Sequence, residues 1–233
     1  MFPFSGLLLF LGTMALSLWA TWRVKRIYMR YSQVPAASGI TGAEAAARIL
    51  DRAGIHDVEI VAQEGMLGDH YDPMHKRLVL SHENYYGTSL AALGVSAHEC
   101  GHAVQHKIAY APLKWRMLAV GATTFANQVV MWLPLIGMFT GMIRPYTGLM
   151  LMAVAWGVIM IFNLITLPVE FDASRRAKAI LSGMGFIREG EESDGVKRTL
   201  DAAGWTYVAA FITSLAYFLW HLLPLLTGRS DDE

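Results

Sequence analysis

Long apolar stretches alternate with two polar regions along the chain. A helix that crosses the roughly 30 Å hydrocarbon core of a bilayer needs about 20 mainly apolar residues. Four stretches meet this requirement, at 4–22, 117–143, 146–167 and 205–226. We therefore expect four transmembrane helices, which leaves polar regions at 23–116 and 168–204.

The basic residues predict how these helices are oriented. Arg23, Lys25 and Arg26 directly follow the first apolar stretch, and no basic residue precedes it. No small-x-small cleavage site follows it either, so we interpret this stretch as a retained anchor and not as a signal peptide. Most of the lysines and arginines lie in the two polar regions. By the positive-inside rule, we expect a multi-pass protein of the inner or plasma membrane, with both polar regions in the cytoplasm and both termini outside.

Composition and charge narrow the function classes. The chain is 54% hydrophobic and 16% charged, which excludes a disordered protein. Its 19 basic and 19 acidic side chains cancel, so no overall positive field attracts DNA or RNA, and we expect no nucleic-acid partner. The single cysteine, Cys100, cannot form an internal disulfide, which excludes the class of small disulfide-stapled secreted domains.

Shorter patterns predict the elements of the polar regions. Thr41 followed three residues later by Glu44 is a capping box, which opens a helix. Apolar residues at steps of three and four indicate a later helix, and two short β-branched or alternating runs indicate strands. The expected helices lie at 41–53, about 89–107 and 170–181, the strands at 58–62 and 77–81, and turn-rich loops at 65–73 and 182–195. Neither polar region is long enough to bury a full core alone, so we expect one small α+β domain assembled from both.

Residues 98–102 read His-Glu-Cys-Gly-His and lie inside the helix predicted at 89–107. Positions i and i+4 share one helical face, so His98 and His102 can bind one zinc ion at about 2.0 to 2.1 Å each. Glu99 can flank that ion without binding it, which is the position of a general base. These residue types in this order predict one Zn²⁺ per chain.

A catalytic zinc site needs a third protein ligand from elsewhere in the chain. Glu170 is the best candidate, because a hairpin of the second and third apolar stretches would return it to the neighbourhood of His102. Asp172 is its main rival. Cys100 lies between the two histidines and points to another helical face, so we do not expect it to bind. His106 repeats the i+4 step, but three histidines along a straight helix cannot converge on one tetrahedral ion, and we expect a polar surface role for it.

Three runs of residues carry a resemblance to a known family. They are Gly68–Pro73, Ala97–His106 and, after two apolar stretches, Val-Glu-Phe-Asp-Ala-Ser-Arg-Arg-Ala at Val169–Ala177. Together they resemble the bacterial membrane-bound neutral zinc metallopeptidase family over nearly the whole chain. The chain is more distantly similar to heat-shock membrane proteases and CAAX-prenyl proteases, which are gluzincins. The resemblance implies a gluzincin-like cytoplasmic catalytic domain with Glu99 as the base. The zinc ligands that it implies are His98, His102 and Glu170.

The chain departs from these distant relatives at one position. They carry Glu-x-x-x-Asp, whereas Glu170 is followed four residues later by Ser174. The carboxylate that usually orients a ligand histidine is therefore unassigned, and Asp172 is a candidate substitute.

The resemblance implies an integral-membrane zinc endopeptidase that acts on membrane or membrane-proximal polypeptides. Glu99 would assist the attack of zinc-bound water on a peptide carbonyl. Arg175 and His70 are the expected stabilisers of the negative charge that develops, with Arg176 and Tyr71 as further candidates. The expected partners are the lipid bilayer and the polypeptide substrate, and a homo-oligomer or a membrane-protein partner stays open.

An extended substrate can be held by main-chain pairing with the edge of a sheet. The run Arg77–Ser81 lies directly upstream of the helix that carries the two histidines. We predict that this run forms an edge strand that binds the substrate, with a plain interior strand as the alternative.

Two other functions are compatible with the motif. A membrane di-iron oxygenase or desaturase is one, because His98, His102 and His106 also form H-x-x-x-H boxes. Such enzymes need roughly eight histidines in several boxes, commonly including H-x-x-H-H, and that box is absent. The other is a non-catalytic metal-binding adaptor. Replacing Glu99 by Gln distinguishes a hydrolase from an adaptor. The hydrolase variant should keep its zinc and lose turnover, whereas the adaptor variant should keep its function.

Overall fold

The computed structural model describes residues 2–65 and 68–228. The chain divides into two compact units. Within the described residues, the first unit holds the chain up to Trp19, Trp115–Leu167 and the chain from Tyr207. The second unit holds Ala20–Lys114 and Pro168–Thr206.

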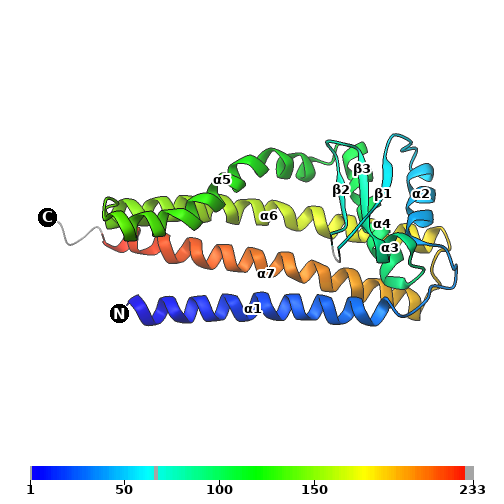
Figure 1. Ribbon diagram of the computed structural model, residues 1–233, viewed down its shortest axis with the longest axis horizontal. Helices are drawn as coiled ribbons and strands as arrows, with labels where there is room; N and C mark the ends of the chain where they lie inside the picture. Colours follow the sequence, from blue (N-terminus) through cyan, green and yellow to red (C-terminus); the bar gives the residue numbers. More distant parts are fainter. Residues whose placement is uncertain (1, 66–67, 229–233) are drawn as a thin grey trace. The chain divides into compact units, whose positions relative to one another are not determined.

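Four long helices dominate the chain (Figure 1). They are α1 (Phe2–Tyr31), α5 (Ala111–Thr140), α6 (Pro145–Gly183) and α7 (Glu191–Thr227). All four are long and apolar enough to cross a membrane, and only 11% to 17% of their most apolar windows is buried inside the protein. Apolar side chains that face outward over such lengths are suited to lipid and not to water.

The helices run further than the apolar stretches alone predict. The helix expected at 170–181 is the continuation of α6, which passes through Pro168 without ending. The loop expected at 182–195 is shorter, because α7 already begins at Glu191. In contrast, α5 ends at Thr140, three residues before the predicted end, and Gly141 follows it with a φ of +63°. A left-handed glycine of this kind is a common helix terminator.

The first unit contains a small apolar core and paired polar groups. Ala126, Ala155 and Ile159 form the buried cluster. The Asn163 side-chain amide in this unit donates to the Ser214 hydroxyl at 3.0 Å and to the Ala210 carbonyl at 3.2 Å. A satisfied amide between two apolar helices supports helix packing.

The second unit contains a three-stranded sheet. Its strands are β1 (Glu59–Gln63), β2 (His70–Asp72) and β3 (Arg77–Ser81), in the order β1-β3-β2. Strand β3 pairs in parallel with β1 and antiparallel with β2. The prediction that Arg77–Ser81 is an edge strand is therefore wrong, because this strand is central. Its continuous buried run, Leu78 to Ser81, is typical of a strand covered on both sides.

Three shorter helices complete the second unit. The capping box at the start of α2 (Gly42–Arg52) is confirmed, because the Thr41 side chain accepts from the Glu44 N–H and the Glu44 carboxylate accepts from the Thr41 N–H. Helix α3 (His82–Tyr86) lies in a stretch for which we predicted no element. Helix α4 (Leu90–Lys107) carries the two motif histidines and begins with the Ser89 hydroxyl accepting from the Ala92 N–H. The core includes Ile49 of α2, Leu78 and Leu80 of β3, Leu93 and Ala97 of α4, Leu181 of α6 and Val196 of α7.

Candidate metal centre

The second unit brings together three side chains that can hold a metal ion. The Nε2 atom of His98 lies 3.2 Å from Glu170 Oε2, and the Nε2 atom of His102 lies 3.5 Å from the same oxygen. One ligand atom from each of the three residues can be chosen so that all lie within 4.8 Å of one another. Helix α4 supplies both imidazoles and helix α6 supplies the carboxylate.

The distance from each imidazole to the carboxylate fits a small tetrahedral cation. Ligand atoms about 2.0 to 2.1 Å from a zinc ion in tetrahedral geometry lie roughly 3.3 Å from one another. The two nitrogen-to-oxygen distances of 3.2 and 3.5 Å bracket that value. Two neutral imidazoles and one carboxylate are also ligands that zinc prefers, and three protein ligands leave a fourth position open.

The metal-binding group lies mostly inside the protein. The side chain of Glu170 is 3% exposed, whereas that of His98 is 13% exposed. His102 and Glu99 are also buried. The site is therefore shielded from bulk water, and electrostatic interactions within it are stronger than at a surface.

Glycine at position 101 allows α4 and α6 to approach closely. A Cβ atom at Gly101 would lie 2.9 Å from the Ala173 carbonyl oxygen and 3.1 Å from the Ala173 Cα. Both are backbone atoms of α6, so no side-chain rotation could relieve the contact. Glu170 lies one turn before Ala173 on α6, and His102 directly follows Gly101. The absence of a side chain at Gly101 thus brings the carboxylate within reach of the imidazoles.

A series of hydrogen bonds links His102 through Gln105 to helix α6. Its Nδ1 atom lies 3.0 Å from the Gln105 Oε1 atom. The Gln105 Nε2 atom donates to the Val169 carbonyl at 2.8 Å and to Asp172 Oδ2 at 3.0 Å. Asp172 therefore contacts a histidine only through Gln105, and it does not belong to the three-residue metal-binding group.

A different residue contacts the outer nitrogen of His98. The Ser174 hydroxyl lies 3.1 Å from His98 Nδ1. Ser174 is the residue that stands where the distant relatives carry an aspartate, so a hydroxyl takes this place behind the first histidine. Both imidazoles thus have their Nδ1 atoms occupied and their Nε2 atoms directed at Glu170.

The charges of the site act on His102. Burial disfavours the imidazolium form, but the hydrogen bond to Glu170 and the negative charges of Glu99 and Glu170 outweigh it and raise the pKa of His102. In the metal-free protein, His102 therefore holds a proton more firmly than an ordinary histidine.

Cys100 faces away from the metal-binding group. Its side chain is fully buried, and its sulfur lies 3.8 Å from the Ala46 carbonyl of α2. Burial raises the pKa of the Cys100 thiol, so the thiol stays protonated at neutral pH. The expectation that this residue does not bind the metal agrees with its position.

The expected charge-stabilising residues lie outside the three-residue group. Arg175 and Arg176 both form ion pairs with Asp172, and the Arg175 side chain is 77% exposed. His70 Nδ1 lies 2.8 Å from the Gly68 carbonyl. The Tyr71 hydroxyl lies 2.9 Å from Nδ1 of His106, which is half-buried and not simply a surface residue.

Sequence reasoning missed the residues behind the histidines, Gln105 and Ser174. Position 105 lies three residues after His102, and that spacing places it on the same side of α4. A polar residue there could have been proposed as a partner of His102. Nothing in the spacing of Ser174 indicates which histidine it contacts, because that depends on the rotation of α6.

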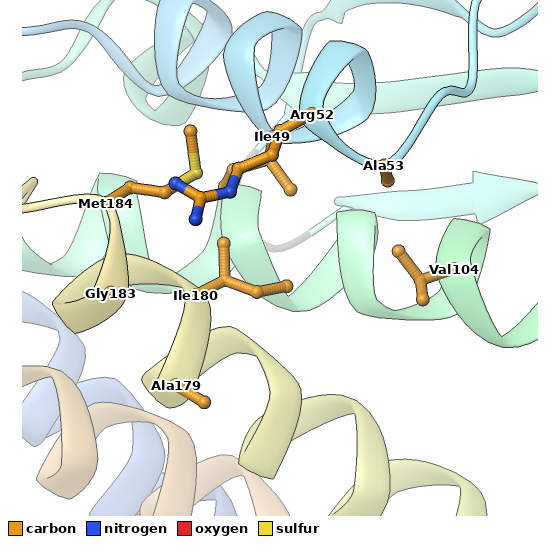
Figure 2. A pocket seen from close by; sticks show the side chains of 8 residues that line it. All are labelled: Ile49, Arg52, Ala53, Val104, Ala179, Ile180, Gly183 and Met184. Carbon is orange, nitrogen blue, oxygen red and sulfur yellow. The ribbon is translucent and has the colours of Figure 1, made fainter.

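A separate cavity of about 330 Å³ lies elsewhere in the second unit. Apolar side chains of α2, α4 and α6 line most of it, and Figure 2 shows the Arg52 guanidinium reaching over Ile180 toward Met184. None of the three metal-binding residues lines this cavity.

Comparison with known proteins shows the family to which the chain belongs. A sequence profile for the family described as "Putative neutral zinc metallopeptidase" matches residues 6–226. A protein of Bacillus subtilis (strain 168) named "Putative membrane protease YugP" is 44% identical over 223 residues, which are 95% of this chain and 97% of that protein. No solved structure matches the chain significantly. The chain is therefore a multi-pass membrane protein that belongs to the neutral zinc metallopeptidase family.

Proposed function

We propose that this protein is a zinc-dependent endopeptidase that hydrolyses peptide bonds of membrane or membrane-proximal polypeptides. The observation that carries the proposal is that His98 Nε2 and His102 Nε2 lie 3.2 and 3.5 Å from Glu170 Oε2, in a group whose ligand atoms all lie within 4.8 Å of one another. The family and the protease-named relative support the same activity. We further propose that the site faces the cytoplasm and that both termini face outward, because the basic residues gather in the two polar regions.

Zinc held by these three residues would polarise a peptide carbonyl and lower the pKa of water to about 7. Side chains of the protein would carry out the proton transfers. The Glu99 carboxylate accepts the proton of the attacking water and then delivers it to the leaving amine. Two observations support this role: Glu99 directly follows the ligand His98 in the sequence, and its side chain is buried.

Negative charge on the former carbonyl oxygen needs a hydrogen-bond donor, and Arg175 and His70 remain our predicted donors. Arg175 is ion-paired with Asp172 and largely exposed, so it would have to leave this partner to reach a substrate. An Arg175→Gln variant should lower kcat and leave zinc binding intact. Unchanged kcat would remove Arg175 from the mechanism.

We infer that β2, and not β3, is the strand that receives the substrate. Strand β2 lies at an edge of the sheet, and its residue Tyr71 reaches α4 through the hydrogen bond to His106. An extended polypeptide could add to this edge by main-chain hydrogen bonds.

The decisive experiment compares zinc content and peptide hydrolysis in the purified full chain. Wild type should contain one zinc per chain and cleave an unfolded membrane-protein substrate. Glu99→Gln should keep its zinc and lose cleavage, whereas Glu170→Ala should lose both. An Asp172→Ala variant that loses zinc while Glu170→Ala retains it would overturn the ligand assignment.

The same experiment separates the alternative functions. An adaptor should keep its function in Glu99→Gln. A di-iron oxygenase should contain about two iron ions per chain in place of zinc. The described residues group only two histidines and one carboxylate at one site, which does not favour the oxygenase.

A further inference from the structure

The orientation of the Gln105 side chain is set by its surroundings. Gln105 is fully buried, so water cannot complete its hydrogen bonds. One end of its amide faces the Val169 carbonyl and the Asp172 carboxylate, both of which only accept hydrogen bonds. The NH₂ group must therefore lie at this end, and Oε1 must face His102.

This orientation fixes the proton on the imidazole. The Gln105 Oε1 atom can only accept, so Nδ1 of His102 must donate across their 3.0 Å contact. A neutral His102 then has its lone pair on Nε2, the atom 3.5 Å from the Glu170 carboxylate. We propose that Gln105 is a positioning residue that holds His102 in the tautomer required for metal binding, and that Asp172 and the Val169 carbonyl hold Gln105. The inference rests on the proposed zinc site.

The use of an amide has an electrostatic reason. Zinc-binding histidines commonly donate directly to a carboxylate, which adds negative charge behind the ligand. Here Glu99 and Glu170 already place two carboxylates at a buried site, and Asp172 is neutralised by ion pairs with Arg175 and Arg176. Gln105 thus selects the tautomer of His102 and adds no further charge next to these groups.

His102 and His98 have hydrogen-bond partners of different chemistry. Ser174 can both donate and accept, so its 3.1 Å contact with His98 Nδ1 does not by itself specify a tautomer. In contrast, the Gln105 Oε1 atom that faces His102 Nδ1 can only accept a hydrogen bond. We therefore expect zinc binding to depend more on Gln105 than on Ser174.

The test measures zinc affinity by chelator competition on the full chain in detergent. Gln105→Met keeps the side-chain length but cannot accept the proton of Nδ1, and it should weaken zinc binding about 10- to 100-fold. Gln105→Glu keeps an acceptor opposite Nδ1 but loses the two donor contacts to Val169 and Asp172, so it should bind zinc less tightly than wild type and more tightly than Gln105→Met. Ser174→Ala should lose less affinity than Gln105→Met.

A matched control separates positioning from general stability. Asn84 is also a buried amide, which accepts from the Tyr28 hydroxyl at 2.9 Å and donates to Asp69 at 3.0 Å. Asn84→Leu should lower the unfolding temperature of the metal-free protein and change the zinc dissociation constant of the folded protein by less than about threefold.

The outcomes distinguish the two proposals. Wild-type protein that binds no zinc would overturn the proposed function together with this inference. Wild-type protein that binds zinc, with Gln105→Met binding it equally tightly, would overturn the role of Gln105 alone. Equal zinc affinity losses in Gln105→Met and Asn84→Leu would show that only stability matters, and would also refute it.

Discussion

Replacing Gly101 by Ala should separate the two helices that form the metal centre. The new Cβ would lie 2.9, 3.1 and 3.3 Å from the oxygen, Cα and carbonyl carbon of Ala173. Favourable contacts between carbon atoms begin at about 3.5 Å, so the backbones must move apart by roughly 0.5 Å at this point. Glu170 lies one turn away on the moving helix, and its carboxylate should move with it.

The expected magnitudes follow from this displacement. Overpacking of a buried contact costs about 1 to 3 kcal/mol. Alanine favours the helix over glycine by about 1 kcal/mol, so the net loss of unfolding free energy should be roughly 0 to 2 kcal/mol. Zinc–ligand distances are held within about 0.2 Å, so a shift of Glu170 should weaken zinc binding more than it weakens the fold. We expect at least a tenfold rise in the zinc dissociation constant, which corresponds to about 1.4 kcal/mol.

Gly94, on the same helix, provides the matched control. A Cβ at Gly94 would meet only the Val196 Cγ1 atom, at an ordinary 3.5 Å. Gly94→Ala should therefore raise the unfolding temperature slightly and leave zinc affinity unchanged. The assays are thermal unfolding of the metal-free proteins and zinc titration against a chelator. Gly101→Ala protein that binds zinc as tightly as wild type would refute the claim that this close approach sets the site.

Three further predictions concern the metal, pH and a structural network. Removing zinc with a chelator should abolish peptide hydrolysis and lower the unfolding temperature, and added zinc should restore both. Activity that persists in fully zinc-depleted protein would exclude a zinc enzyme. Because the pKa of His102 is raised in the metal-free protein and this proton must leave before zinc binds, apparent zinc affinity should fall as the pH is lowered through that pKa. Calorimetry in buffers of different ionisation enthalpy should detect the released proton, and identical heats in all buffers would contradict this. Asp69 accepts hydrogen bonds from the Ser81 N–H, the Ser81 hydroxyl and the Asn84 amide. Asp69→Ala should therefore reduce the unfolding free energy by about 1 to 3 kcal/mol. It should not change zinc affinity in the folded protein. Denaturant unfolding measures this loss, and an unchanged midpoint would show that the network is dispensable.

Local patterns predicted the elements that depend on local interactions. The helix expected at about 89–107 agrees with α4 at Leu90–Lys107, because its apolar repeat and Ser89 cap lie within its own sequence. Glu170 was reached differently, through the expected hairpin and the family resemblance. Its contact with His98 spans 72 residues, which no local pattern specifies.

The remaining features depend on how elements pack. Strand β2 has only three residues, too few to show an alternating pattern, and its pairing with β3 makes β3 central. The contacts of Gln105 and Ser174 depend on how α6 is rotated against α4, and sequence spacing does not determine this rotation. The catalytic roles of Glu99, Arg175 and His70 stay predictions.

The enclosed position of Cys100 has a practical consequence. It is the protein's single cysteine, and its thiol is shielded from solvent and held protonated by burial. Maleimide reagents, which attack exposed thiolates, should leave the native protein unlabelled. A cysteine introduced near either end of the chain would then be the sole reactive group, and a membrane-impermeant label could report directly which side of the bilayer it occupies.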